Sequence, residues 1–213
     1  MKKTEIILKE GYPFILATAI IFLISLIFRF DVIWQLVWFG IMACMVYFFL
    51  NPERIPQETG EDVIISPADG EIIEITTQKE PFFTNTEMIK ISIRLGFFDN
   101  HIQRSPIEGI LKQQKYIHGE FLALNSPKAS ELNEQNRTLF ENNKISVVTN
   151  QIAGFITRRI ISWLNEGDVE LAQRYGMIMF GSQVDIYVPK ETILKVIVGE
   201  KIKAGETLIG FVR

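Results

Sequence analysis

The sequence contains few of the residues that metal sites and disulfides require. Its 213 residues include a single cysteine, Cys44, and two histidines, His101 and His118. A single cysteine cannot form a disulfide within the chain, so the fold does not depend on an oxidising compartment. Two histidines without a cysteine pair argue against a zinc site of ordinary ligands, and we expect no bound metal. The net charge of −3 argues against a nucleic-acid-binding protein, because such proteins are usually basic.

Charged residues are also scarce in the first 50 positions, where two apolar runs follow each other. The runs extend from Tyr12 to Phe28 and from Val32 to Leu50, with Arg29-Phe30-Asp31 between them. Each run approaches the ~20 residues that a helix needs to cross the hydrocarbon core of a membrane. A signal peptide would instead be followed by a cleavage site and a soluble sequence. We therefore expect an N-terminal transmembrane helical hairpin; the alternatives are one long membrane-embedded or re-entrant helix and a buried core hairpin.

The charges around the hairpin predict its orientation. Arg29 lies in the turn, whereas four positive residues flank the two ends: Lys2, Lys3, Lys9 and Arg54. Because positive residues favour the cytoplasmic side, we expect the rest of the chain to face the cytoplasm from the cytoplasmic (inner) membrane. Pro52 and Pro56 end the second apolar run. The expected division is a membrane anchor over residues 1–56 and a second domain over residues 57–213.

The pattern of the second domain is typical of short strands. Met88 to Leu95 alternates apolar and polar residues, and the stretch after Gly181-Ser182 alternates in the same way, which predicts a half-buried strand. Pro67-Ala68-Asp69-Gly70 has the composition of a tight turn between two strands. Glycines interrupt the C-terminal pattern at regular intervals. The domain is therefore predicted to be mainly β, a compact β-sandwich or barrel.

Two stretches of this domain are ambiguous. Lys144 to Trp163 is rich in β-branched residues but also has apolar residues at near-helical spacing, and we favour strands there. Ser130 to Asn142 is polar and acid-rich. It predicts a loop or a short helix.

Three residues are candidates for catalysis: Ser182, His101 and Asp69. Together they could form a nucleophilic triad, although the Gly-x-Ser-x-Gly elbow of many hydrolases is missing. A serine after Gly181 has another option, in which its hydroxyl attacks the preceding carbonyl and the chain cuts itself. A turn residue remains the third reading of the same pair. The residues by themselves leave these alternatives open.

A set of motifs distributed over nearly the whole chain resembles the short, prokaryotic-type phosphatidylserine decarboxylase proenzymes. The motifs, in order, are Phe48-Phe49-x-Asn51-Pro52-x-Arg54, Pro67-Ala68-Asp69-Gly70, His101-x-x-Arg104-Ser105-Pro106-x-x-Gly109, Gly119-x-Phe121, Lys128-Ala129-Ser130-Glu131-x-Asn133-Glu134, Gln151-Ile152-Ala153-Gly154 with Arg158-Arg159, and Tyr175-Gly176-Met177-Ile178-x-Phe180-Gly181-Ser182. Each motif is weak alone, but the ordered set is specific.

The resemblance implies a self-cleaving enzyme. The family is cut between the positions that match Gly181 and Ser182, which implies two chains, 1–181 and 182–213, that remain associated. Ser182 would become a pyruvoyl cofactor, which condenses with the amine of phosphatidylserine and accepts the electrons released when carbon dioxide leaves. Asp69 matches a position tied to self-cleavage, and His101 matches one tied to acid–base chemistry. The resemblance also implies a lipoyl-like β domain, a phospholipid substrate in the bilayer and phosphatidylethanolamine as the product; it is compatible with a homo-oligomer.

The chain departs from the family pattern at Arg104. Larger members have His-x-x-His where this chain has His101-x-x-Arg104. Arginine stays protonated and is a poor base, but its planar donors suit a carboxylate or phosphate. We therefore expect Arg104 to contact substrate rather than to transfer a proton. For self-cleavage, either His101 serves in both steps or Asp69 acts with a water. Arg158 and Arg159 are candidates for the lipid phosphate, with a solvated basic edge as the alternative.

Two other functions fit part of the sequence. A membrane-anchored, non-catalytic lipoyl-like scaffold would account for the anchor and the glycine pattern of the C-terminus. A serine hydrolase would use Ser182 with His101 and Asp69. Phe97 and Phe98, beside the His101 segment, are expected to enter the acyl region of the bilayer if the substrate is a lipid.

Overall fold

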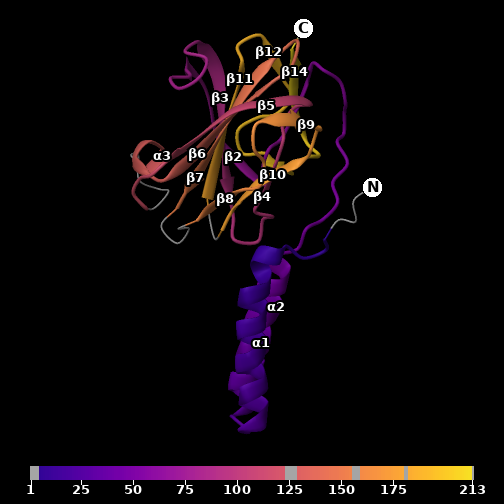
Figure 1. Cartoon of the computed structure of the whole chain (residues 1–213), viewed down its shortest axis with the longest axis vertical. Helices are drawn as coiled ribbons and strands as arrows, with labels where there is room; N and C mark the ends of the chain where they lie inside the picture. Colours follow the sequence, from indigo (N-terminus) through magenta and orange to yellow (C-terminus); the bar gives the residue numbers. More distant parts are fainter. Residues whose placement is uncertain (1–4, 123–128, 155–158, 180–181, 213) are drawn as a thin grey trace. The chain divides into compact units, whose positions relative to one another are not determined.

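The computed structural model describes residues 5–122, 129–154, 159–179 and 182–212 (Figure 1). The chain divides into two compact units, Met1–Glu53 and Arg54–Arg213.

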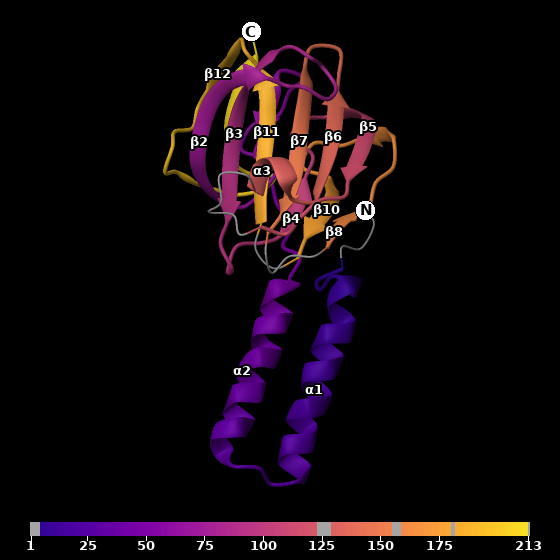
Figure 2. The ribbon, with the colours of Figure 1, turned by 90° about the vertical axis from the view of Figure 1, so that its left-hand side faces the viewer.

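The first unit is a hairpin of two apolar helices. A short 3-10 helix, η1 (Lys9–Gly11), leads into α1 (Tyr12–Ile27), and α2 (Val32–Phe48) returns beside it (Figure 2). The turn between the helices uses a left-handed residue, Arg29, with φ 51°. Asp31 caps α2 by accepting a hydrogen bond from the backbone of Ile33 at 3.1 Å. These two residues explain why the chain reverses between the apolar runs.

The two ends of the hairpin are joined to each other. The N–H of Leu8 donates to the carbonyl of Phe49 at 3.0 Å, and Ile7 forms an antiparallel bridge with Leu50. The Phe22 and Phe39 rings lie 5.8 Å apart between the helices. Both ends of the hairpin therefore lie together, which confirms the predicted hairpin.

The apolar helices expose most of their side chains. The helical segment Lys9–Ile27 is long and apolar enough to cross a membrane, and only 11% of its most apolar 18-residue window is buried. The second apolar helix, Val32–Phe48, is shorter than that length. Such exposure of apolar side chains is typical of a membrane-associated segment and argues against a core hairpin.

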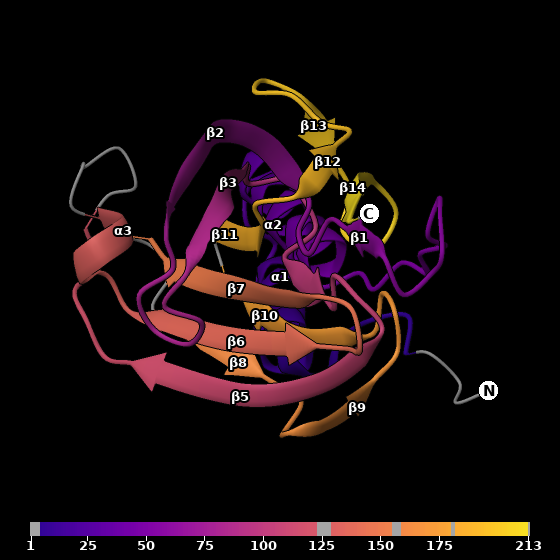
Figure 3. The ribbon, with the colours of Figure 1, turned by 90° about the horizontal axis from the view of Figure 1, so that it is seen from above.

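The second unit is mainly β, as predicted (Figure 3). Its largest sheet is antiparallel and has eight strands in the order β13 (Lys201–Ile202), β2 (Gly70–Lys79), β3 (Glu87–Leu95), β11 (Ser182–Pro189), β7 (Ser146–Ala153), β6 (Gln135–Glu141), β5 (Gly109–Ile117) and β9 (Gly167–Val169). One smaller antiparallel sheet has the order β1 (Val63–Ile65), β14 (Leu208–Val212) and β12 (Thr192–Leu194); another has the order β4 (Ile102–Arg104), β10 (Arg174–Ile178) and β8 (Ile160–Ser162). No sheet closes into a barrel within the described part of the chain.

The main core lies between the large sheet and the two small ones. On the inner face of β11, Val184 and Ile186 pack with residues of β3, β1, β14 and β10 in one buried cluster. Ile186 of β11 is opposite Ile91 of β3, so neighbouring strands place apolar residues at the same level. A side chain of this size stabilises the fold by about 1.5–3 kcal/mol when it is fully buried.

The outer face of β11 is also buried, so the prediction of a half-buried strand was wrong. Gln183 and Asp185 are almost inaccessible to solvent. The side-chain amide of Gln183 donates to Asp185 at 2.8 Å and to the hydroxyl of Ser130 at 3.2 Å. Ser130 belongs to the short helix α3 (Ala129–Leu132), which covers this face (Figure 2). Hydrogen bonds among the polar side chains allow them to be buried without a large loss of stability.

The prediction for Ser130 to Asn142 was only partly correct. α3 forms as a short helix, but Gln135–Glu141 is strand β6, paired with both β5 and β7. Phe140 anchors the strand in the core, where its ring lies 5.2 Å from that of Tyr175. For Lys144 to Trp163, β7 and β8 confirm the strands that we favoured.

Gly70 and Gly167 provide a test of this architecture. Both have a positive φ, +148° and +145°, that side-chain-bearing residues rarely adopt. A Cβ at Gly70 would lie 2.3 Å from the Arg94 carbonyl, whereas a Cβ at Gly167 would meet nothing within 4 Å. We expect Gly167→Ala to cost about 1–2 kcal/mol of unfolding free energy through backbone strain, and Gly70→Ala about 3 kcal/mol or more because the clash is added. The midpoints of thermal unfolding of both variants in the same detergent check this order; equal decreases would contradict the close approach of β2 and β3.

Candidate active site

One end of the large sheet holds the segment around Ser182. β10 ends at Ile178, and β11 begins at Ser182. Gly181 and the side chain of Ser182 lie outside the described part of the structure. The backbone of Ser182 pairs with Leu95 of β3 on one side and with Ala153 of β7 on the other. The first residue after the predicted cut is therefore held in the middle of the sheet.

His101 is held close to the same point. The N–H of Ile178 donates to the His101 carbonyl at 3.2 Å. Three residues lead from Ile178 to Gly181, and they can span at most ~11 Å. Residues 96–101 connect Leu95, opposite Ser182, with His101, opposite Ile178. This loop therefore begins and ends beside the two strands that flank the predicted cut.

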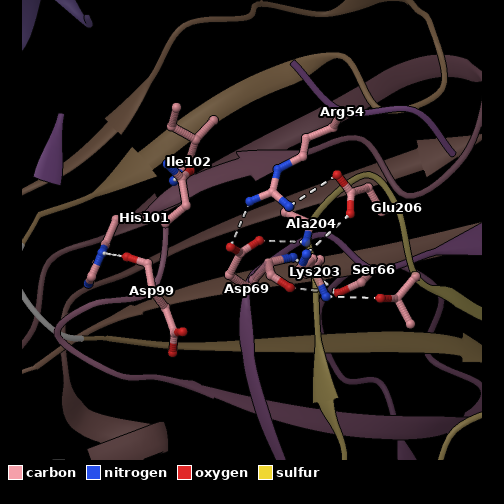
Figure 4. A network of polar contacts seen from close by, with 12 residues as sticks. Arg54, Ser66, Asp69, Asp99, His101, Ile102, Lys203, Ala204 and Glu206 are labelled. Carbon is pink, nitrogen blue, oxygen red and sulfur yellow. Dashed lines mark hydrogen bonds and ion pairs between the residues drawn. The ribbon is translucent and has the colours of Figure 1, made fainter. Parts of the chain in front are cut away.

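The ring of His101 is fully buried in a defined tautomer. Its Nδ1 atom lies 2.7 Å from the Asp99 carbonyl oxygen (Figure 4). A carbonyl oxygen can only accept, so Nδ1 carries the proton and Nε2 has the lone pair. Burial, more than any other effect, lowers the pKa of His101 to about 4, against a smaller upward effect of Asp99. At neutral pH the ring is therefore uncharged, and Nε2 is the ring atom that can accept a proton.

Asp69 lies in the turn between β1 and β2, and both of its carboxylate oxygens are held. Oδ2 lies 2.9 Å from Arg54 Nη2, and Oδ1 accepts a hydrogen bond from the Ala204 N–H at 2.7 Å (Figure 4). Burial raises the pKa of Asp69, opposed first by the charge of Arg54 and then by backbone hydrogen bonds from Ala204 and Asn100. The bond from Asn100 places this carboxylate beside the loop that carries His101.

Arg104 is buried next to the Asp69 turn. Its Nη1 donates to the Ala172 carbonyl at 3.0 Å, and its backbone N–H donates to the Pro67 carbonyl at 2.9 Å. Burial, followed by the charges of Arg174 and Arg54, lowers the pKa of Arg104 to about 10. It is therefore still a cation at neutral pH and cannot serve as a base.

Two further arginines, Arg158 and Arg159, were candidates for contact with the lipid phosphate. Arg158 lies outside the described residues. Arg159 is exposed, and its carbonyl accepts a hydrogen bond from the N–H of Met179 at 3.3 Å. Arg159 therefore lies beside the segment that leads to Gly181.

Sequence reasoning missed a buried chain of amides behind His101. Gln103 Nε2 donates to the His101 carbonyl at 2.9 Å, Gln151 donates to Gln103 at 2.8 Å, and Asn136 donates to Gln151 at 2.7 Å. These residues fix the backbone of the His101 segment from the interior of the domain. The signal for them is their polar character within strands that are otherwise apolar.

A cavity of about 260 Å³ opens beside this end of the sheet. It is lined by Gly70, Glu71, Ile73, Arg94, Leu95, Gly96, Asp99 and Lys201. The lining includes Leu95, which pairs with Ser182, and Asp99, which binds the His101 ring. A larger cavity of about 510 Å³ lies on the outer face of the large sheet and contains none of the predicted site residues.

Within the described ranges, no group of three or more His, Cys, Asp or Glu residues could hold a metal ion.

Comparison with known proteins identifies close relatives of the whole chain. A family model for phosphatidylserine decarboxylase matches residues 41–210. The phosphatidylserine decarboxylase proenzyme of Syntrophus aciditrophicus is 39% identical over 99% of both chains, and that of Carboxydothermus hydrogenoformans is 36% identical over 100% of both. The proenzyme of Ehrlichia canis is 38% identical over 96% of this chain and 91% of its own.

The tautomer and charge of His101 can be measured directly, because the chain has only two histidines. In a His118→Gln variant with ¹⁵N-labelled histidine, we expect one imidazole that is protonated at Nδ1, uncharged at neutral pH and titrating near pH 4. His118 has a side chain that is 92% exposed, so its replacement should leave the fold unchanged. A midpoint near 6.5, or a proton on Nε2, would contradict this geometry.

Proposed function

The chain belongs to the phosphatidylserine decarboxylase family, and we propose that it converts phosphatidylserine to phosphatidylethanolamine and carbon dioxide. The full-length match to named proenzymes disfavours the scaffold and the serine hydrolase. The observation that carries the proposal in this chain is the start of the central strand β11 at Ser182, shortly after Ile178, whose N–H donates to the His101 carbonyl.

Self-cleavage would begin at the hydroxyl of Ser182. Its oxygen attacks the Gly181 carbonyl carbon, and the peptide C–N bond breaks to leave an ester and a free amine on residue 182. Loss of the α-proton of residue 182 expels the Gly181 carboxylate. The resulting enamine takes up water and loses ammonia, which leaves a pyruvoyl group on chain 182–213 and a normal C-terminus on chain 1–181.

We assign the first proton transfer to His101. In its tautomer Nε2 is the basic atom, and the ring is uncharged at neutral pH. We also assign Asp69 a role in self-cleavage, because its carboxylate lies beside the loop that carries His101. The pyruvoyl group supplies the carbonyl that binds the substrate amine and the electron sink that loss of carbon dioxide needs.

The contacts to substrate are assigned to arginines. Arg159 is exposed beside the segment before Gly181, so we propose Arg159, with its neighbour Arg158, for the lipid phosphate. Arg104 was expected to bind the carboxylate or phosphate. Its Nη1 bond to the Ala172 carbonyl supports an additional structural task for the guanidinium.

The two chains would stay together after the cut. Residues 182–213 contribute β11 and β13 to the large sheet and β12 and β14 to a small one. A lipoyl-like β-sandwich is the finer fold that we propose, supported by short C-terminal strands separated by turns at Gly199 and Gly205, both with positive φ.

The proposed location is the cytoplasmic (inner) membrane, with the catalytic domain in the cytoplasm. The joined ends of the hairpin support an anchor that enters and leaves the bilayer on one side. We also propose the division into an anchor over residues 1–56 and a catalytic domain over residues 57–213. Tethering keeps the enzyme at the surface that contains its substrate.

Replacement of Ser182 tests self-cleavage. We expect the purified wild-type protein to give two masses, corresponding to chains 1–181 and 182–213, the smaller with a blocked N-terminus. Ser182→Ala should give one uncut chain, because the attacking hydroxyl is gone. Ser162→Ala, which removes an exposed serine of β8, should still be cut. Continued cleavage of Ser182→Ala at the same bond would rule out attack by this hydroxyl.

Phe97 and Phe98 test contact with the bilayer. They are 49% and 71% exposed in the loop of residues 96–101. We expect Phe97→Ser with Phe98→Ser to lower turnover of phosphatidylserine in vesicles about tenfold, and turnover of a short-chain soluble analogue much less, because two apolar side chains would no longer enter the membrane.

The control for this pair is Ile197→Ser with Val198→Ser. These neighbouring apolar residues are similarly exposed, at 71% and 55%, but lie outside the loop. Their replacement should change neither assay. Equal losses on vesicles and on the soluble analogue for the phenylalanine variant would count against membrane contact.

A further inference from the structure

We propose that Arg54 is a positioning residue for Asp69, and that it sets the pH range in which the chain cuts itself. The inference rests on the proposed self-cleavage, and it assigns to Arg54 a task that neither the motif pattern nor the comparisons provide. Arg54 acts through Asp69 and need not contact the bond that breaks.

The guanidinium of Arg54 joins two carboxylates from distant parts of the chain. Nη2 lies 2.9 Å from Asp69 Oδ2, and Nη1 lies 3.2 Å from Glu206 Oε1. Figure 4 shows Arg54 between the two acids. Its side chain is largely buried, so this interaction is screened by water far less than a surface ion pair. The planar fork of arginine suits such a bridge better than the single ammonium group of lysine.

The bridge connects the two chains that the cut would produce. Arg54 and Asp69 would belong to chain 1–181, whereas Ala204 and Glu206 would belong to chain 182–213. The turns that carry these acids are also joined through their backbones. Gly205 N–H donates to the Ser66 carbonyl at 2.8 Å, and Ser66 N–H donates to the Thr207 carbonyl at 2.8 Å. Before the cut, the Asp69 carboxylate is thereby held by residues of both future chains.

The charge of Asp69 is a balance between opposing effects. Burial favours the protonated acid, whereas Arg54 and two backbone donors favour the carboxylate. Asp99 of the 96–101 loop also acts on Asp69, and Asp69 acts on Arg104 of β4. The charged groups next to these are Arg174 of β10, which acts on Arg104, and Glu206, which pairs with Arg54 and with Lys203. Of the groups that lower the pKa of Asp69, Arg54 has the largest effect. Loss of this cation would therefore leave a neutral acid over a wider pH range.

The sign of the pH effect follows from this balance. If cleavage needs the Asp69 carboxylate, its rate falls as pH drops through the pKa of Asp69. A cation within hydrogen-bonding distance lowers a carboxyl pKa by ~1–3 units. Arg54→Gln should therefore move the acid limb of the pH profile, where the cleavage rate falls with falling pH, up by ~1–3 pH units. At alkaline pH this variant should again be cut, because Asp69 is then a carboxylate. Arg54→Lys should keep the limb close to that of the wild type, because the charge remains.

Glu206→Gln provides a second variant with an opposite expectation. It breaks the same network, but it leaves Arg54 with Asp69 as its sole carboxylate partner in the bridge. The acid limb should then stay in place or move to lower pH. If the two substitutions only disturbed packing, both variants would be cut more slowly and the pH profile of neither would shift. If Arg54→Gln does not fold, an upward shift in Glu206→Gln would by itself overturn the inference.

The experiment follows the full-length chain during its own maturation. The chain is synthesised in a cell-free system with nanodiscs, moved to buffers between pH 5 and 10, and sampled for intact mass. Lys90→Gln is the matched control, since Lys90 forms a 2.9 Å ion pair with Glu74 on the outer face of the large sheet. Its pH profile should equal that of the wild type. An uncut wild-type chain would refute the proposed function, whereas a cut wild type with an unshifted Arg54→Gln profile would refute only the role of Arg54.

Discussion

The structure of the candidate site depends on the pairing of β11 with a neighbour on each side. β3 and β7 hold the backbone of this strand from Ser182 onward, so its first residue cannot move far when the preceding bond changes. A terminal strand on a sheet edge would fray, because half of its backbone groups would lack a partner. The outer face of β11 is covered as well, through the contact of Gln183 with Ser130 of α3. The buried polar residues Gln183 and Asp185 carry a desolvation cost there that a solvent-exposed face would avoid.

Around this strand, burial and hydrogen bonding set the charge state of each candidate group. His101 is kept neutral by burial, and its bond to the Asp99 carbonyl directs the proton to Nδ1. Asp69 experiences the same desolvation, but it has a cation and two backbone donors to oppose it. Arg104 remains positive despite burial. His101, Asp69 and Arg104 thus provide a neutral imidazole, a carboxyl group whose charge depends on opposing effects, and a cation.

Local patterns in the sequence predicted the elements whose side chains have one dominant environment. The apolar runs around Arg29-Phe30-Asp31 predicted the hairpin, and the alternation from Met88 to Leu95 predicted β3. β6 was missed because Gln135 and Arg137 are polar residues that become buried by hydrogen bonding to each other. The candidate residues Asp69, His101 and Ser182 could be proposed from their types and order. The bond between Asp69 and Ala204 could not, because it joins residues 135 positions apart through turns whose register only the folded sheets determine.

The distribution of residues 182–213 over two sheets has a consequence for the lifetime of the protein. In the uncut chain, these strands are covalently linked to their partners, and folding is a reaction of one molecule. After a cut before Ser182, the same strands would have to find their partners in solution, without the effective concentration that the chain provided. Unfolding of the two associated chains would then be irreversible in practice. The lifetime of the folded protein would be set by its unfolding rate rather than by an unfolding equilibrium. Such a protein has one opportunity to fold, before it becomes active.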